Sequence, residues 1–176
     1  LEVTLSDVKS KPVLALLRGF SAPVHIKYPY TQSALLLLMC HDPDVYVRWY
    51  AHLQCIIDFV KSYIALNCDS DRYPQLSDQY INAYQQVLLD KQLYPASRVE
   101  IISLPSERFL LEMLPGVDFD CLHSVLEWLK IQIATRCYDV LYECYTSHVT
   151  HVPYEYRLAE VAKRHVRRHC LSLMMY

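Results

Sequence analysis

Glycine is almost absent from this sequence, which has only 2 glycines among 176 residues. Glycine supplies the positive φ angles on which tight β-hairpins and phosphate-binding loops depend. Gly19 and Gly116 lie far apart, so the chain cannot carry the glycine-rich nucleotide-binding motifs or the G-x-S-x-G nucleophile turn. The sequence excludes those enzyme classes and favours helices joined by proline-marked turns.

Long apolar runs and an excess of one charge are also lacking. The longest strongly apolar run, Ala34 to Cys40, is far shorter than the roughly 20 residues with which a helix crosses a bilayer. The formal net charge is −2 and the pI is near 6.5, which gives no broad attraction to nucleic-acid phosphates or to an anionic membrane. We therefore expect neither nucleic acid nor a membrane among the partners.

The spacing of the cysteines excludes another group of sites. Seven cysteines are present and no two are closer than seven residues, which rules out C-x-x-C zinc ribbons and thioredoxin-like pairs. Their odd number and their place in apolar helical stretches predict reduced, buried thiols in a cytoplasmic compartment. The chain opens without a signal peptide, and its last helical pattern is still running at Tyr176, so we expect a piece of a longer protein.

The first 28 residues differ from the rest in their pattern. β-type runs occur at Leu1 to Leu5, Val13 to Leu17 and Val24 to Tyr28, separated by proline and glycine. Three short strands do not make a stable independent sheet. We expect residues 1–28 to be the last strands of a β-sandwich domain that begins upstream.

From residue 29 to residue 176 the pattern is helical. Thr31 is the expected cap of a first helix, and Asp42 followed by Pro43 is the expected start of a second, long one. The first of these helices contains the run Ser33 to His41. Further helices are predicted at Ser77 to Leu89, Ser97 to Ser103, Ser106 to Leu114, after Asp118 and after Pro153. Such helices, each with one apolar face, predict a mainly α fold of antiparallel pairs in a bundle or an armadillo-like solenoid.

His165 and His169 form the one constellation that could bind a metal, because histidines four residues apart share a helix face. A catalytic zinc helix has glutamate after its first histidine, whereas Val166 stands there and two arginines follow it. The preferred interpretation is a packed or half-exposed face beside a solvated basic edge. We interpret His148 and His151 as ordinary polar residues of a loop, since no nearby Cys or carboxylate completes a set of metal ligands.

Several tyrosines gather near the end of the chain and suggest a stacking platform. Tyrosine at helical spacing is more often the edge of a core with its hydroxyl in water, and we prefer that interpretation. The sequence thus assigns no catalytic, cofactor-binding or metal-binding residue. The tyrosines concerned are Tyr138, Tyr142, Tyr145, Tyr154 and Tyr156.

The segment Lys11 to Val24 reads KPVLALLRGFSAPV and closely resembles the end of the β-sandwich domain in the bacterial aminopeptidase N family, the alanyl aminopeptidase branch of the gluzincins. Later segments resemble the helical domain that follows in that family, in the same order. These segments are Arg48-Trp49, Val87 to Asp90, Ile101 to Glu107, Ala162 to Arg164, and Cys170-Leu171.

The resemblance implies a zinc-dependent parent enzyme that removes N-terminal amino acids from peptides. Its zinc ligands, a His-Glu-x-x-His motif and a distal Glu, would lie upstream of Leu1, so this fragment would hold no zinc and have no peptidase activity of its own. The helical domain would enclose the active-site cavity and restrict access, with the catalytic domain of the same chain and peptide substrates as partners. The alternative is a free-standing helical scaffold for protein–protein interaction.

Overall fold

The computed structural model describes residues 9, 12–16, 18–20, 28–66, 72–150 and 153–176. Within these ranges the chain forms a short 3₁₀ helix, η1 (Arg18–Phe20), followed by α-helices and no strand. No helix in the described ranges is long and apolar enough to cross a membrane. The α-helices are α1 (Gln32–His41), α2 (Val45–Ile64), α3 (Asp78–Leu89), α4 (Pro95–Ile102), α5 (Glu107–Met113), α6 (Phe119–Ser147) and α7 (Leu158–Met174).

Polar caps set the start of most of these helices. Thr31, Ser77, Ser106 and Asp118 each accept a hydrogen bond from the backbone N–H three residues later, at 3.0 to 3.3 Å. Each such bond satisfies one of the N–H groups that the first helical turn leaves without a partner. The predicted starts of α1, α3, α5 and α6 are therefore confirmed to within a residue or two.

Two predicted helix starts were wrong. The cap of α2 is Asp44, whose Oδ1 accepts from the Tyr46 N–H at 2.8 Å, whereas Asp42 ends α1 and accepts from the Asp44 N–H at 2.9 Å. The D-P-D sequence offers two capping carboxylates, and the second is the one at the helix start. Helix α7 begins at Leu158 and not directly after Pro153.

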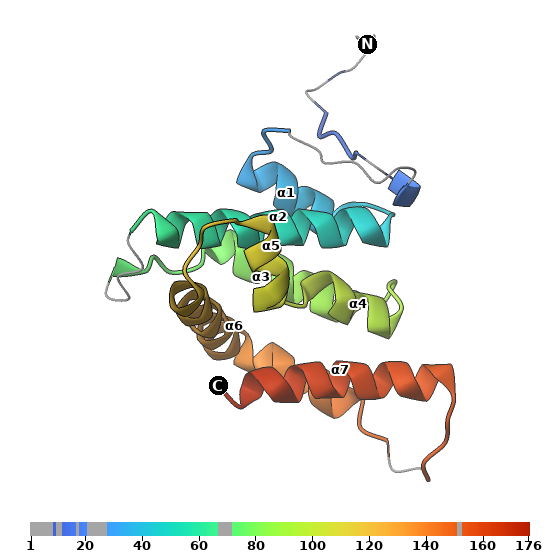
Figure 1. The fold of residues 1–176 in the computed structure, drawn as a ribbon. Coiled ribbons are helices and arrows are strands. Elements are labelled where there is room, and N and C mark those ends of the chain that lie inside the picture. Colours follow the sequence, from blue (N-terminus) through green and yellow to red (C-terminus); the bar gives the residue numbers. More distant parts are fainter. Residues whose placement is uncertain (1–8, 10–11, 17, 21–27, 67–71, 151–152) are drawn as a thin grey trace.

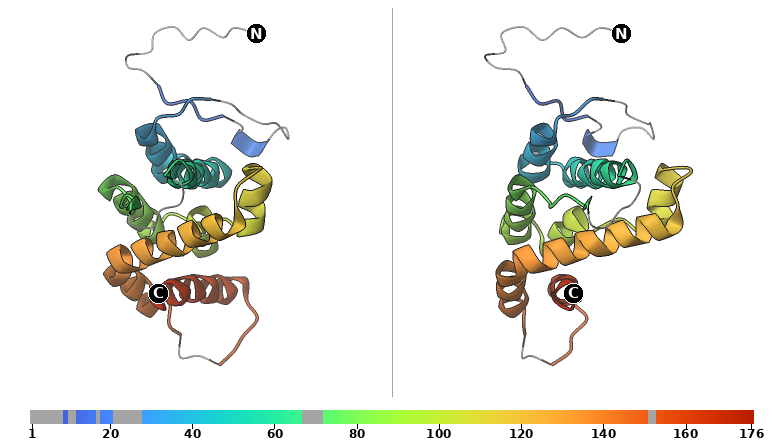
Figure 2. Two further views of the ribbon diagram at one scale, coloured as in Figure 1. Left: turned by 60° about the vertical axis from the view of Figure 1, so that its left-hand side comes forward. Right: turned by 90° about the vertical axis from the view of Figure 1, so that its left-hand side faces the viewer.

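The helices are arranged as a ladder of antiparallel pairs. Helix α1 packs on α2, α3 on α4, and α6 on α7, while α1, α3 and α6 contact one another in turn and α2, α4 and α7 do the same. Figure 1 shows α2, α4 and α7 stacked with their axes roughly parallel, and Figure 2 shows α1 and α3 alongside in the second layer. Helix α5 packs against α6. The predicted armadillo-like arrangement is confirmed.

The core between the two layers contains aromatic side chains as well as aliphatic ones. Tyr63, Tyr80 and Tyr84 are fully buried. The ring of Phe59 meets the edge of Tyr80 at 5.3 Å between centroids, and Trp128 of α6 meets Tyr63 at 5.0 Å. Edge-to-face pairs of this kind add to the free energy gained by burial. These contacts join α2, α3 and α6 into one core.

The predicted strands fall largely outside the described residues. Leu1 to Leu5 and, apart from Tyr28, the run Val24 to Tyr28 are not described. Residues 13–16, the described part of the predicted run Val13 to Leu17, form no strand. The Leu14 carbonyl instead accepts a hydrogen bond from the Tyr30 hydroxyl at 3.0 Å. A strand needs a neighbouring strand for its backbone groups, and the described part of the chain offers none.

Candidate functional site

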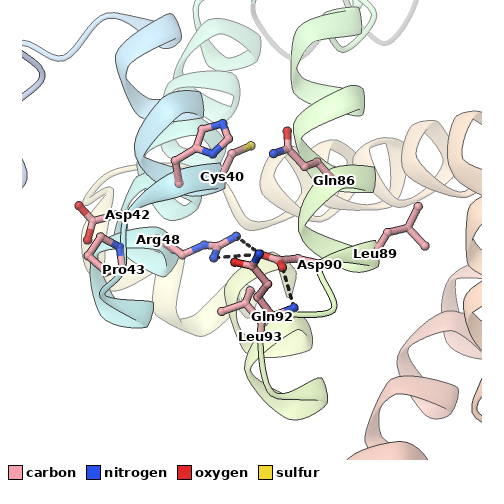
Figure 3. Close-up of a pocket in the computed structure, with 10 residues that line it drawn as sticks. Cys40, Asp42, Pro43, Arg48, Gln86, Leu89, Asp90, Gln92 and Leu93 are labelled. Atoms are coloured by element: carbon pink, nitrogen blue, oxygen red, sulfur yellow. Dashed lines mark hydrogen bonds and ion pairs between the residues drawn. The ribbon is translucent and has the colours of Figure 1, made fainter.

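A polar hollow of about 720 Å³ lies where the end of α1, the start of α2 and the end of α3 meet. Figure 3 shows the side chains of Arg48 and Asp90 pointing toward each other across this hollow. Two carboxylates, a guanidinium, an imidazole and two amides line this hollow. It is lined by Cys40, His41, Asp42, Pro43, Arg48, Gln86, Leu89, Asp90, Gln92 and Leu93.

Arg48 is buried, and three of the five N–H groups of its guanidinium donate to protein groups. Nε donates to the Met39 carbonyl at 2.7 Å, and the two terminal nitrogens donate to Oδ2 of Asp90 at 3.3 and 3.2 Å. The other oxygen of Asp90 accepts from the Gln92 N–H at 3.0 Å. The charge of the guanidinium is therefore already paired with Asp90 within the protein. Its role is to join α1, α2 and the end of α3.

The short helix η1 is bonded to the same corner from outside. Arg18 donates to Asp42 at 2.8 Å, and the Gly19 N–H donates to the other acid, Asp44, at 2.6 Å. Gly19 has a φ of +69°, a conformation that side chains other than glycine rarely adopt. The backbone hydrogen bond from Gly19 is the largest of the effects that lower the pKa of Asp44. The corner therefore fixes the preceding segment on the helical ladder.

The structure separates the two histidines that the sequence singled out. His165 is exposed, while the His169 Nε2 lies 2.9 Å from the Tyr84 hydroxyl of α3. Burial lowers the pKa of His169 to about 4, with a smaller contribution from His165. A neutral His169 bonded to Tyr84 packs α7 onto α3. Among the described residues no group of three His, Cys, Asp or Glu side chains could hold a metal.

A second buried pair was not predicted. His52 of α2 lies with Nε2 2.9 Å from the hydroxyl of Tyr80 of α3, and burial lowers its pKa to about 3. Tyr80 and Tyr84 are four residues apart and therefore share a helix face. That spacing could have indicated two tyrosines on one face of α3. It could not have indicated their histidine partners, which are 28 and 85 residues away in sequence.

The tyrosines near the end of the chain do not form one platform. Tyr138, Tyr142, Tyr154 and Tyr156 are exposed, and within the described ranges no ring contact joins any of them to another. Tyr145 is half-buried, and the guanidinium of Arg167 lies 5.5 Å from its ring centroid. His148 uses Nδ1 within its own helix end, 2.8 Å from the Cys144 carbonyl, whereas His151 is outside the described residues.

The model of one protein family, described as a domain of unknown function (DUF3458_C) with ARM repeats, matches residues 32–176. The chain belongs to this ARM-repeat family. The two layers of antiparallel helices described above are the kind of fold that this description implies.

Aminopeptidases are similar to this ARM-repeat chain over almost all of its length. Aminopeptidase N of Escherichia coli is 31% identical over 97% of the chain, and that of Caulobacter vibrioides is 27% identical over 98%. A solved structure, Legionella pneumophila aminopeptidase A in complex with aspartic acid, is 27% identical over 96% of the chain, with a TM-score of 0.83. The predicted resemblance is confirmed. The chain spans about a fifth of the length of these relatives.

The described free thiols of this ARM-repeat chain are buried in helix contacts, while Cys68 lies outside the described residues. Cys40, Cys55, Cys137, Cys144 and Cys170 are free and buried. Burial raises the pKa of Cys55 to about 12 and that of Cys137 to about 11, so both are protonated packing groups. Cys121 is disulfide-bonded, which differs from the predicted pattern of reduced, buried thiols.

Proposed function

We propose that this chain is a non-catalytic part of a longer, zinc-dependent aminopeptidase that removes N-terminal amino acids from peptides. In this proposal residues 1–28 are the last strands of a β-sandwich domain, and residues 29–176 are the first part of a helical domain. The supporting observation is similarity to aminopeptidases over nearly the whole chain, combined with a span of only a fifth of their length.

The zinc of the proposed enzyme would be held outside this chain. The donor groups described here do not fit it, because His169 is bonded to Tyr84 and the residues between His165 and His169 include Arg167 and Arg168. Two cations beside a ligand pair oppose the binding of a dication. In this proposal no residue of this chain binds the zinc or takes part in hydrolysis.

The contribution of the helical ladder is to enclose the active-site cavity and to restrict which substrates enter. A closed site excludes water and large substrates through shape and stiffness, not through reactive groups. The buried bonds that join α2, α3 and α7, together with the aromatic core, supply that stiffness. The partners in this proposal are the catalytic domain of the same polypeptide and peptide substrates, not nucleic acid or a membrane.

We also propose a cytoplasmic location for the enzyme. Five free, buried thiols favour a reducing compartment, whereas a disulfide such as the one at Cys121 is more typical of an oxidising compartment.

The full-length protein that contains this chain provides the test. We expect it to hydrolyse an alanyl anilide and short peptides, to lose that activity with a zinc chelator, and to leave the N-terminus of a folded protein uncut. The gene upstream of Leu1 should encode His-Glu-x-x-His and a distal Glu. Chelator-sensitive hydrolysis by the isolated 176-residue chain would contradict the proposal.

The alternative function is a free-standing scaffold that binds another protein. One observation favours it: Ile131, Tyr138 and Tyr142 of α6 are exposed along one helix face, as in a partner-binding surface. A further helix pair of the same solenoid would cover that face equally well. A gene that encodes no zinc motif upstream of this chain would favour the scaffold.

A further inference from the structure

A mainly apolar groove of about 510 Å³ runs across the layer formed by α2, α4 and α7, away from the polar hollow. The start of α2 supplies its aromatic wall, where the rings of Tyr46 and Trp49 lie 5.5 Å apart. Helix α4 contributes Glu100 and Ser103, and α7 contributes His165. The groove is therefore built by three helices of one layer and depends on the ladder being assembled.

The polar groups at this groove are not used by the protein itself. Within the described residues, neither the Glu100 carboxylate nor the His165 ring forms a hydrogen bond or an ion pair, and the Trp49 indole N–H has no acceptor. Ser103, by contrast, is already bonded to the Val99 carbonyl at 2.6 Å. The unused groups are one donor, one anion and one imidazole beside an apolar wall.

The charge of Glu100 is left uncompensated by its neighbours. No described lysine or arginine lies within ion-pair distance of this carboxylate. Lys163 of α7 is paired with Glu160, and Arg164 lies over the ring of Tyr154 at 4.8 Å. A ligand that places a cation at Glu100 would thus meet no competitor from the same surface.

We propose that this groove is a secondary peptide-binding site, in which Trp49 donates to a backbone carbonyl of an extended peptide and Glu100 pairs with a lysine or arginine side chain. The aromatic wall packs against an apolar neighbour of that basic residue. The proposal rests on the proposed function: the peptide is the downstream part of a substrate whose N-terminus is at the distant metal. Binding energy from such remote residues can serve catalysis.

A binding experiment tests the groove without any catalysis. The probe is a fluorescein-labelled, N-acetylated peptide that contains an aromatic residue next to lysine, titrated with the full-length protein and followed by anisotropy. Because exposed ion pairs are weak, we expect Glu100→Gln to weaken binding by about three- to fivefold. Glu100→Lys should reverse the preference, so that the matched peptide with glutamate in place of lysine binds better. Trp49→Phe keeps an aromatic ring, removes the N–H and should also weaken binding.

The control variant is Glu112→Gln, which removes one exposed carboxylate on α5, a helix that contributes no residue to the groove, and should leave the affinity unchanged. Equal binding of the lysine and glutamate peptides by the wild-type protein, or an unchanged preference in Glu100→Lys, would overturn the proposal. That outcome would indicate that the groove is covered by another part of the same polypeptide.

Kinetic measurements then distinguish a failure of the groove proposal from a failure of the proposed function. With unblocked peptides, the ratio of kcat/KM for the lysine peptide to that for the matched glutamine peptide should fall in Glu100→Gln, through KM and not through kcat. Charge-dependent binding of the acetylated peptide without any aminopeptidase activity would refute the proposed function and leave the groove standing. Activity with no charge-dependent binding would refute the groove alone.

Discussion

The outer corner of the molecule and its interior use the same kinds of polar groups in different ways. At the corner, Arg18 reaches Asp42 from the surface, with 56% of its side chain exposed. In the interior, Arg48 has only 5% of its side chain exposed, and two histidine–tyrosine pairs lie between the helices. The Arg18 guanidinium is open to water, although Asp42 has only 2% of its side chain exposed, whereas the buried guanidinium of Arg48 is not open to water. Burial, and not the type of bond, should decide how much each contact stabilises the fold.

Removal of the Arg48 side chain should have the largest effect. Arg48→Ala leaves the buried Met39 carbonyl and the partly buried Asp90 without their partner, which we expect to cost about 3 kcal/mol. The measurement is urea denaturation followed by circular dichroism. Arg108→Ala is the matched control, because Arg108 is an exposed arginine that pairs with Glu112 on α5. Equal losses in the free energy of unfolding would show that the buried arginine contributes no more than the exposed one.

The two buried histidines should make stability depend on pH. The pKa of His52 is lowered to about 3 and that of His169 to about 4, so the unfolded chain binds more protons than the folded one below pH 6.5. Stability is therefore fully present above about pH 6.5 and lost as pH falls toward 4, by about 1.4 kcal/mol per pH unit for each histidine. Urea midpoints between pH 7.5 and 5 measure this slope. His169→Gln should reduce the slope, and an unchanged slope would contradict the assignment.

Loss of one buried hydroxyl should have a smaller effect. Tyr84→Phe keeps the ring but leaves the His169 Nε2 without its partner, which we expect to destabilise the protein by about 1–3 kcal/mol. Tyr142→Phe serves as the matched control, because the Tyr142 side chain is exposed on α6. Thermal unfolding of both variants checks the difference, and similar shifts in Tm would show that burial of the hydroxyl does not matter.

The smallest effect is expected at the corner. Arg18→Ala removes a bond made by an exposed side chain, while Asp42 still accepts from the Asp44 N–H and Gly19 still donates to Asp44. We expect its urea midpoint to stay closer to wild type than that of Tyr84→Phe. A loss as large as that of Arg48→Ala would mean that attachment of η1, and not burial, governs stability.

Local signals in the sequence were enough for most of the fold. Ser77, Ser106 and Asp118 cap helices because their short polar side chains satisfy nearby N–H groups, an interaction confined to four residues. The same reasoning failed at Asp42, since two carboxylates two residues apart both fit the local capping pattern and η1 bonds to both of them. Local chemistry could not settle that competition.

The candidate sites were harder to predict than the fold. The groove joins Trp49, Glu100 and His165 from three helices, and nothing in the spacing of these residues indicates that they converge. His165 and His169 share a helix face, yet one is exposed and the other meets Tyr84. Contacts between distant segments depend on how the helices cross, which the apolar pattern of a single helix does not specify.

Helix α6 differs from its neighbours in length, and this has a mechanical consequence. Its 29 residues extend over roughly 44 Å, whereas the 8 residues of α4 cover about 12 Å. One rod thus reaches α5 as well as α3 and α7. A tilt of about 5° around its midpoint would displace each end by roughly 2 Å. A displacement of α5 would therefore be transmitted along α6 to the helices that contact its opposite end.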